Sequence, residues 1–237
     1  MHSKTVPIGH GLDWITQGFG LFQLNPGIWI ANLVIFIVLL ATVSLLPIAG
    51  PFAALLLQPV LMGGLFGGCR ALRQGQALTV DQLFDGFREH THPLMMVGVL
   101  SGVGNLLVGL IALAVLVSFV GLGALTGGLA EQSGLAAGGA MLGILLAGLV
   151  GVGLSVPIAM AVWFAPALVV FDGLTAFAAM QASFFACLRN LLPFLLYGLV
   201  LLALSFVALI PAGLGMLVLG PVAVASVYVS YEDLFGH

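Results

Sequence analysis

The residues best suited to chemistry lie in one short polar segment of the sequence. His90 and His92 stand next to Glu89, and Asp81, Asp85 and Glu89 recur at every fourth position. A metal centre needs three or four converging ligands, and paired carboxylates can serve acid–base catalysis. A solvated linker and an exposed acidic helix face account for these residues with fewer assumptions. We therefore expect neither a metal site nor a catalytic centre in this segment.

The rest of the sequence offers no other catalytic signature. It contains no HExxH zinc motif, no G-x-S-x-G nucleophile elbow and no Walker A loop. The five lysines and arginines are scattered and the net charge is −3, which argues against nucleic-acid binding, since that requires a clustered basic patch. We expect a protein that is not an enzyme and needs no cofactor.

Composition indicates that most of the chain lies in lipid. The 237 residues are 62% hydrophobic and only 5% charged, against roughly 25% charged residues in soluble domains, and the mean hydropathy is +1.27. A membrane span needs about 20 mostly apolar residues. Six stretches meet this requirement: 28–48, 51–69, 94–120, 139–163, 193–210 and 212–230.

The spans are predicted to pair as three helical hairpins within one integral membrane domain, 1–237. Prolines mark the turns of the first and last pairs, at Pro47–Pro51 and at Pro211, and a Gly-rich loop over about 121–138 separates the middle pair. The fold class expected is all-α and polytopic. The three hairpin units cover roughly residues 12–69, 79–170 and 175–231.

Orientation follows from the basic residues. With six spans, all five of them fall on one side of the membrane, and the positive-inside rule assigns that side to the cytoplasm together with both termini. Three of them adjoin span ends, where they can reach lipid headgroups. These candidate headgroup contacts are Arg70, Arg73 and Arg189.

An amphipathic stretch that ends in a proline precedes each hairpin, which suggests a repeat. The first carries Leu12, Ile15, Phe19 and Phe22 on one face before Pro26. The second carries Val80, Leu83, Phe84 and Phe87 before Pro93, with Thr79-x-x-Gln82 as a capping box. The third carries Phe177, Met180, Phe184 and Leu188 before Pro193. Short aromatic helices of this kind are expected to lie in the membrane interface.

The predicted spans contain no Asp, Glu, Lys, Arg or His, which argues against an ion-coupled transporter or proton pump. Their amides, Asn32, Gln58 and Asn105, are candidates for intramembrane polar contacts, because an amide in hydrocarbon needs a partner. Hydrogen bonding between helices is the simpler interpretation. A polar path for a neutral solute is the alternative.

Two overlapping Gly-x-x-x-Gly pairs on the second span predict a face for close helix packing. They are formed by Gly63, Gly64, Gly67 and Gly68. The pattern leaves open whether the partner helix belongs to the same chain or to a second copy.

The motifs "GFGLFQLNPGIWI", "GGCRALRQGQ…LFDGF" and "ACLRNLLPFLLYGL", in this order between hydrophobic hairpins, resemble a family of small bacterial inner-membrane proteins described as a domain of unknown function. The resemblance covers nearly the whole chain. It implies a bacterial inner membrane and six spans, and it implies no activity, substrate or catalytic residue.

Two functions fit these observations. The first is a structural or accessory protein that binds membrane lipids and either other membrane proteins or further copies of itself, through its amphipathic helices and Gly face. The second is a small transporter or channel for a neutral or apolar solute, with Pro59, Pro157, Pro166 and Pro221 breaking helices around a cavity. The absence of site chemistry favours the first.

Overall fold

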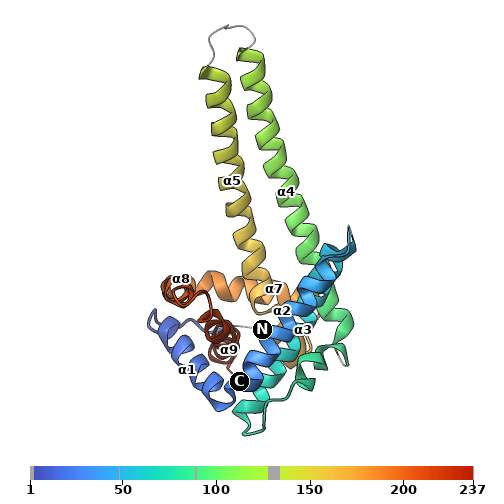
Figure 1. The fold of residues 1–237 in the computed structure, drawn as a ribbon, viewed down its shortest axis with the longest axis vertical. Coiled ribbons are helices and arrows are strands. Elements are labelled where there is room, and N and C mark those ends of the chain that lie inside the picture. Colours follow the sequence, from blue (N-terminus) through green and yellow to red (C-terminus); the bar gives the residue numbers. More distant parts are fainter. Residues whose placement is uncertain (1–2, 48, 89, 128–133, 237) are drawn as a thin grey trace. The chain divides into compact units, whose positions relative to one another are not determined.

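The computed structural model describes residues 3–47, 49–88, 90–127 and 134–236, with side chains left undescribed over 122–127 and 134–140 (Figure 1). Six of the helices in this described part are long and apolar enough to cross a membrane, which confirms the all-α polytopic prediction. The elements are α1 (His10–Leu24), α2 (Pro26–Ser44), α3 (Ala49–Arg73), the 3-10 helix η1 (Asp81–Phe87), α4 (Thr91–Gly127), α5 (Gly134–Trp163), α6 (Ala165–Asp172), α7 (Ala176–Arg189), α8 (Leu191–Leu209) and α9 (Met216–Phe235).

The helices form two compact units. Unit 1 comprises Met1–Leu100 and Met160–His237, and unit 2 comprises Ser101–Ala159. Unit 1 therefore contains α1–α3, η1 and α6–α9, together with the first turns of α4 and the last residues of α5. Unit 2 is the remainder of the α4–α5 hairpin.

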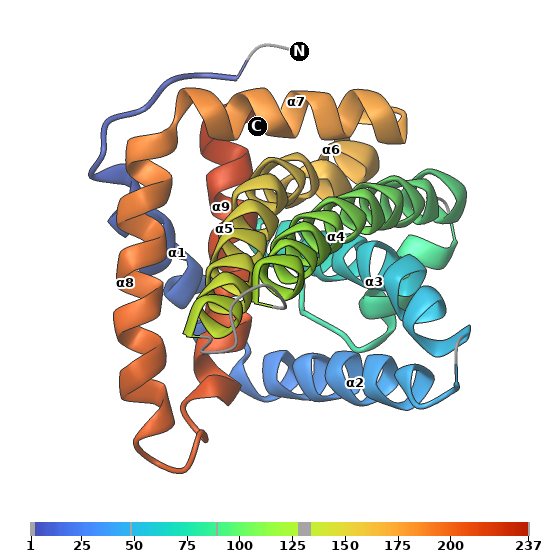
Figure 2. The same ribbon diagram turned by 90° about the horizontal axis from the view of Figure 1, so that it is seen from above.

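Helix α1 lies against α8 and α9 in the core of unit 1 (Figure 2). Two residues of the predicted apolar face, Ile15 and Phe22, are buried, whereas the other two, Leu12 and Phe19, are exposed and Trp14 is buried in their place. Two glycines explain the difference, because a Cβ on Gly11 would lie 2.5 Å from the Pro193 carbonyl oxygen and one on Gly18 would lie 2.7 Å from the Ser226 nitrogen. The side of α1 that carries Gly11, Trp14 and Gly18 thus faces the protein.

Helix α7 buries smaller residues than α1 does. Its buried residues are small: Ala176, Ala179, Ser183, Ala186 and Cys187. The predicted aromatic face points the other way, with Phe177 and Leu188 exposed. An apolar helix that buries its small residues and exposes its large ones suits a lipid boundary, where close packing requires small side chains.

The second amphipathic stretch differs from the prediction of a regular helix. Asp81–Phe87 forms the 3-10 helix η1, and the end of the stretch already belongs to α4, which begins at Thr91. Its backbone is held against α3 at two points, since a Cβ on Gly64 would collide with the Leu83 carbonyl and a Cβ on Gly86 would collide with that of Val60. This packing overrides the 3.6-residue periodicity. The predicted capping box is half formed, with the Thr79 amide donating to Gln82 Oε1 at 3.1 Å.

The three prolines occupy the first turns of spans, as predicted. Pro26 begins α2, Pro93 is the third residue of α4 and Pro193 is the third residue of α8. Proline is tolerated there because the first turn has no intrahelical acceptor for its missing N–H.

A break at Phe164 separates α5 from α6, just before Pro166. Pro166 cannot donate a backbone hydrogen bond, so the interrupted helix leaves polar groups to satisfy. Buried Ser183 of α7 supplies both partners: its hydroxyl accepts from the Phe164 amide at 2.9 Å and donates to the Met160 carbonyl at 2.6 Å. A side chain of a neighbouring helix therefore satisfies the backbone groups at the break in this span.

Unit 2 is an antiparallel pair of helices that contact each other at glycines. A Cβ on Gly104 would approach Ile158, one on Gly143 would approach Phe119, and Gly151 faces Ala112. The Gly-rich loop predicted over 121–138 is shorter than expected, because α4 continues to Gly127 and α5 begins at Gly134. Glu131, its predicted charge, lies outside the described residues.

Candidate functional site

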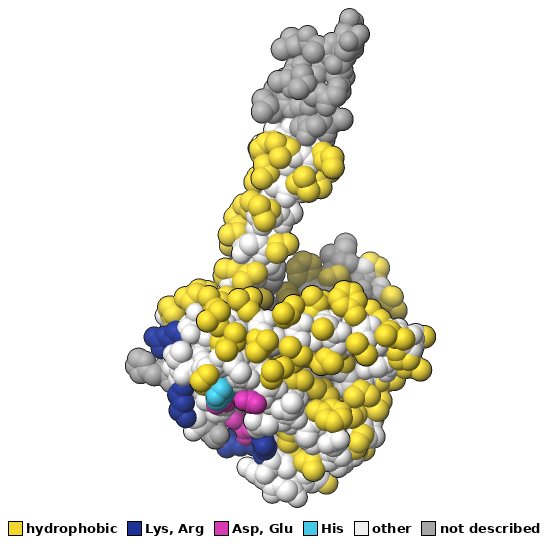
Figure 3. All heavy atoms as spheres, turned by 90° about the vertical axis from the view of Figure 1, so that its left-hand side faces the viewer, with side chains coloured by type: hydrophobic (Ala, Val, Ile, Leu, Met, Phe, Trp, Pro, Cys, Tyr) yellow, Lys and Arg dark blue, Asp and Glu magenta, His cyan; other side chains and the backbone are white. Residues whose placement is uncertain are grey.

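The charged side chains of unit 1 gather where helices end. Figure 3 shows lysine, arginine, acidic and histidine side chains on one part of the surface, with hydrophobic side chains over most of the remainder of that face. The charged and histidine side chains of the described part of unit 1 come from α1, η1, the last turns of α3, α6, α7 and α9, and the first residues of α4 with the segments before α1 and α4. We call this region the polar surface.

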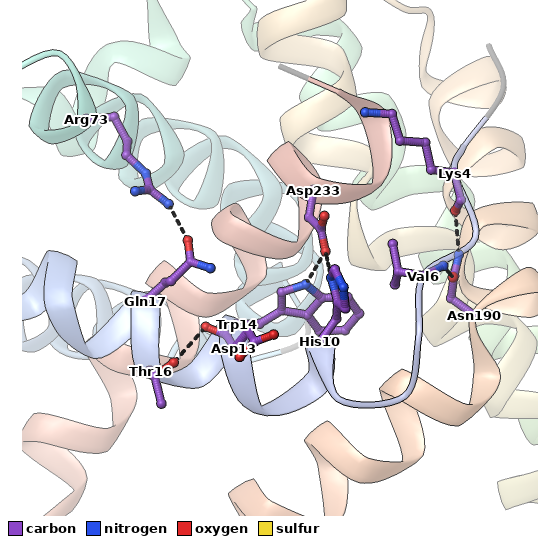
Figure 4. A network of polar contacts seen from close by, with 10 residues as sticks. All are labelled: Lys4, Val6, His10, Asp13, Trp14, Thr16, Gln17, Arg73, Asn190 and Asp233. Atoms are coloured by element: carbon purple, nitrogen blue, oxygen red, sulfur yellow. Dashed lines mark hydrogen bonds and ion pairs between the residues drawn. The ribbon is translucent and has the colours of Figure 1, made fainter.

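Asp233 joins the first and last helices at this surface (Figure 4). Its Oδ2 accepts the Trp14 indole N–H at 2.8 Å and lies 2.8 Å from His10 Nδ1. Trp14 is only 1% exposed, so the carboxylate satisfies a donor that burial would otherwise leave without a partner. This bond fixes α1 against the end of α9.

Arg73 performs a similar structural role at the end of α3. Its Nε donates to Glu232 Oε2 at 3.0 Å and its Nη2 donates to Gln17 Oε1 at 3.1 Å. The guanidinium thus connects α3 with α9 and α1. Nearby, the Tyr231 hydroxyl donates to Asp172 Oδ2 at 2.7 Å and ties α9 to the end of α6.

Asn190 stands at the corner between α7 and α8. Its Oδ1 accepts the Val6 amide at 3.0 Å, and its Nδ2 donates to the Lys4 and Ala186 carbonyls at 3.0 and 2.9 Å. The Lys4 amide in turn donates to the Leu234 carbonyl at 2.8 Å. One buried amide therefore holds the N-terminal segment beside the end of the chain. Sequence reasoning missed Asn190, although Asn25 occupies the equivalent corner between α1 and α2.

Arg70 differs from Arg73. Its Cζ lies 4.9 Å from the centre of the Phe171 ring, and none of the ion pairs found among the described residues includes it. It lines a cavity of about 430 Å³ between α3, η1 and α6. Arg88, His90 and Asp85 supply the remaining polar groups of that cavity.

Arg189, the third predicted headgroup contact, is exposed at the end of α7 and lines a separate cavity of about 330 Å³ with Ser3 and Gln181. The three arginines are therefore not equivalent. Arg73 is engaged within the protein, while Arg70 and Arg189 face cavities at the polar surface.

The predicted amides have different environments. Asn32 is buried and its Nδ2 donates to the Thr79 carbonyl at 3.4 Å, whereas its Oδ1 has no partner among the described residues. Asn105 is exposed and donates to the Ser101 carbonyl of its own helix at 2.9 Å, in place of the expected bond between helices. Gln58 is exposed, although burial was expected. It directly precedes Pro59, on the side of α3 that turns away from the protein core.

The tandem glycines of α3 pack within the chain. Gly64 contacts η1, Gly68 faces Leu78, and a Cβ on Gly63 would lie 3.0 Å from Leu94 Cδ1. Gly67 differs from the prediction of a packing position, because a Cβ added there would meet nothing within 4 Å. It lines the Arg70 cavity instead.

The histidine pair and the cysteines are the remaining candidates for reactive groups. Glu89 lies outside the described residues, and no group of three His, Cys, Asp or Glu suited to a metal was found in the part of the chain that is described. Burial raises the pKa of the Cys187 thiol from its ordinary 9.0 to about 12, so the thiol stays protonated.

A comparison with known proteins shows which family the chain belongs to. The chain is 30% identical over 203 residues to a probable inner membrane protein of Burkholderia thailandensis, covering 82% of this chain and 73% of that protein. The chain belongs to this family of inner membrane proteins. The resemblance predicted from the three motifs is thereby confirmed, as is a multi-pass protein of the inner membrane. No family model matches the sequence, and no solved structure matches it.

Proposed function

We propose that this chain is a structural or accessory protein of the inner membrane that binds lipids and other membrane proteins and has no catalytic role. One observation carries the proposal: polar side chains connect the protein's own elements, while many of its large apolar side chains are exposed. Asp233, Arg73 and Asn190 each join elements that are distant in sequence. The exposed residues include Leu149 of unit 2 and Leu195 of α8.

The orientation proposed places both termini and the polar surface in the cytoplasm. All five basic residues then obey the positive-inside rule. The hydrogen bond between Lys4 and Leu234 supports a common side for the two ends, because it joins the segment before α1 to the last turn of α9. A reporter that fluoresces only in the cytoplasm, fused to the C-terminus, tests this part of the proposal.

The transporter alternative draws less support from the contacts. It rested on amides lining a path, yet Asn105 is bonded within its own helix and Asn32 binds the loop before η1. At the break before Pro166, the Phe164 amide and the Met160 carbonyl are hydrogen-bonded to Ser183.

Photo-crosslinking in the native membrane tests partner binding. A photoreactive amino acid replaces Leu149, whose side chain is 70% exposed, and in a matched variant it replaces Ala147, which is 9% exposed on the same helix. We expect a reproducible protein partner from position 149, identified by mass spectrometry, and a much weaker yield from position 147. If position 149 captures lipid alone and an equivalent probe at Leu195 does the same, binding to other proteins is refuted.

A further inference from the structure

The cavity beside Arg70 has two chemically different walls. One wall is polar and carries the Arg70 and Arg88 guanidiniums, His90 and the Asp85 carboxylate. The other is formed by Gly63, Gly67, Val170 and Phe171. Its volume of about 430 Å³ falls within the roughly 300–1,000 Å³ of small-ligand sites.

The charge on the polar wall suits an anion. Asp85 Oδ1 lies 3.3 Å from Arg88 Nη1 and offsets one of the two guanidiniums. No carboxylate pairs with Arg70 among the described residues, and its guanidinium contacts the Phe171 ring instead. A guanidinium over a ring still presents its N–H groups at the edge, in the fork that matches phosphate oxygens.

The volume of the cavity beside Arg70 depends on Gly67. The other three glycines of the tandem face meet neighbouring atoms of the same chain, whereas Gly67 has open space where its Cβ would be. Helix packing therefore does not explain Gly67. A larger residue there would project into the cavity, one turn before Arg70.

From this geometry we infer that the cavity between α3, η1 and α6 binds a phosphate-bearing anion through Arg70, with Arg88 and His90 beside it. The inference deepens the lipid-binding part of the proposed function and rests on it, since the amphipathic walls suit the headgroup of an anionic phospholipid. Its phosphate would face Arg70, and its glycerol region would lie against Val170 and Phe171. Free phosphate presents the same oxygens to Arg70 and is the second source that the experiment separates.

The test is a titration of the purified full-length chain in neutral detergent, followed by native mass spectrometry and calorimetry. The probes are a short-chain phosphatidylglycerol, the matching phosphatidylcholine, and inorganic phosphate. We expect saturable binding of phosphatidylglycerol, at least about tenfold tighter than phosphatidylcholine. Comparable binding of inorganic phosphate, lost in the same variants, would assign the site to free phosphate and still support the anion site.

Four variants locate the binding. R70Q should weaken it about tenfold or more, with partial recovery in R70K, because a charged hydrogen-bonded contact is removed and then partly restored. R73Q, three residues away on α3, should leave it unchanged. G67L fills the cavity and should abolish binding, while G198L, at an exposed glycine of α8 with equally open space, should not.

The inference is overturned if R70Q and G67L, with thermal unfolding like that of the parent, bind the probes as the parent does. It is equally overturned if phosphatidylcholine binds as tightly as phosphatidylglycerol, or if no probe binds. Crosslinking to protein partners from Leu149 reports on the other part of the proposed function, so the failure of one is distinguishable from the failure of the other.

Discussion

Units 1 and 2 both contain helices apolar enough to cross a membrane, yet they are held together by different means. In unit 1, Leu61, Phe66 and Phe164 are completely buried, and polar side chains such as Asp233 and Asn190 lock distant segments together. In unit 2, Val152 and Leu145 are more than half exposed, and the glycine contacts involve single side chains. Since lipid is as apolar as leucine, no hydrophobic force draws the two helices of unit 2 together.

The difference between the units shows that hydropathy alone does not specify whether a membrane segment packs against other helices. Hydropathy places a segment in the membrane, while small and hydrogen-bonding residues decide whether it acquires protein neighbours. Unit 1 has the interior of a folded protein, and unit 2 depends on the bilayer or on a partner to cover its surface.

The largest expected effect concerns the dry interior of unit 1. With a pKa of about 12, Cys187 carries about one ten-thousandth of its population as thiolate at pH 8, and only the thiolate is nucleophilic. Maleimide labelling of the native chain, quantified by peptide mass spectrometry, should therefore be about 1,000-fold slower at Cys187 than at a cysteine introduced by Q74C on the exposed turn after α3. The Cys187 rate should rise with pH toward 12. Rates within tenfold of each other would contradict a solvent-excluding core.

Alanine substitution of glycines should separate the two units next. In unit 1, G64A places a Cβ on the Leu83 carbonyl and should destabilise the fold by about 3 kcal/mol or more, because backbone must move. In unit 2, G104A meets only the end of the Ile158 side chain and gains helix propensity, so its cost should stay below about 1 kcal/mol. Thermal unfolding in nanodiscs measures both, with G67A as the control that has open space. Equal losses in G64A and G104A would contradict the distinction.

Asparagine substitutions should give a smaller contrast. N190A removes three hydrogen bonds from a buried side chain to part-buried and buried backbone groups, at a cost of about 2 kcal/mol. N105A removes one bond to its own helix from an exposed position of unit 2 and should cost less than about 0.5 kcal/mol. Chemical denaturation followed by tryptophan fluorescence compares them. The comparison between units is refuted if N105A is the more destabilising of the two.

The smallest effect is expected for N32L. The substitution removes the Oδ1 that has no partner among the described residues, which is favourable, and also the donor to the Thr79 carbonyl, which is unfavourable. These opposing contributions should leave stability within about 1 kcal/mol of the parent in the same denaturation assay. A loss as large as that of N190A would show that the amide has a further partner, and would restore it as a candidate for a polar path.

The fold was predictable where a single physical requirement dominates. Spans need a length of apolar residues, and prolines suit first turns, so the six hydrophobic helices and the places of Pro26 and Pro193 follow from the sequence. The burial of Trp14 and Gly18 against α9 was not predictable. Their neighbours lie about 200 residues away along the chain. The spacing of apolar residues in α1 predicted a face that includes Leu12 and Phe19, which are exposed.

The candidate site was likewise predictable in part. Position at a span end identified Arg70, Arg73 and Arg189 as residues able to reach headgroups. It did not distinguish them, because only the fold places Glu232 beside Arg73 and Phe171 beside Arg70. Likewise, the spacing of the tandem glycines indicated close packing, while the open space at Gly67 depends on where η1 and α6 lie.

The docking of α1 on α8 and α9 has a consequence for biogenesis. The ribosome makes α1 first and its partners last, so at roughly 5–20 residues per second α1 waits about 10–40 s before Trp14 can reach Asp233. During that interval the aromatic side chains of α1 must be kept from water by other means, and the membrane surface or a membrane-protein chaperone can do so. The packing of α1 on α9 therefore forms late, and it forms only if the last hairpin has been inserted correctly. Chains truncated before α9 should stay open there and be removed by membrane proteases.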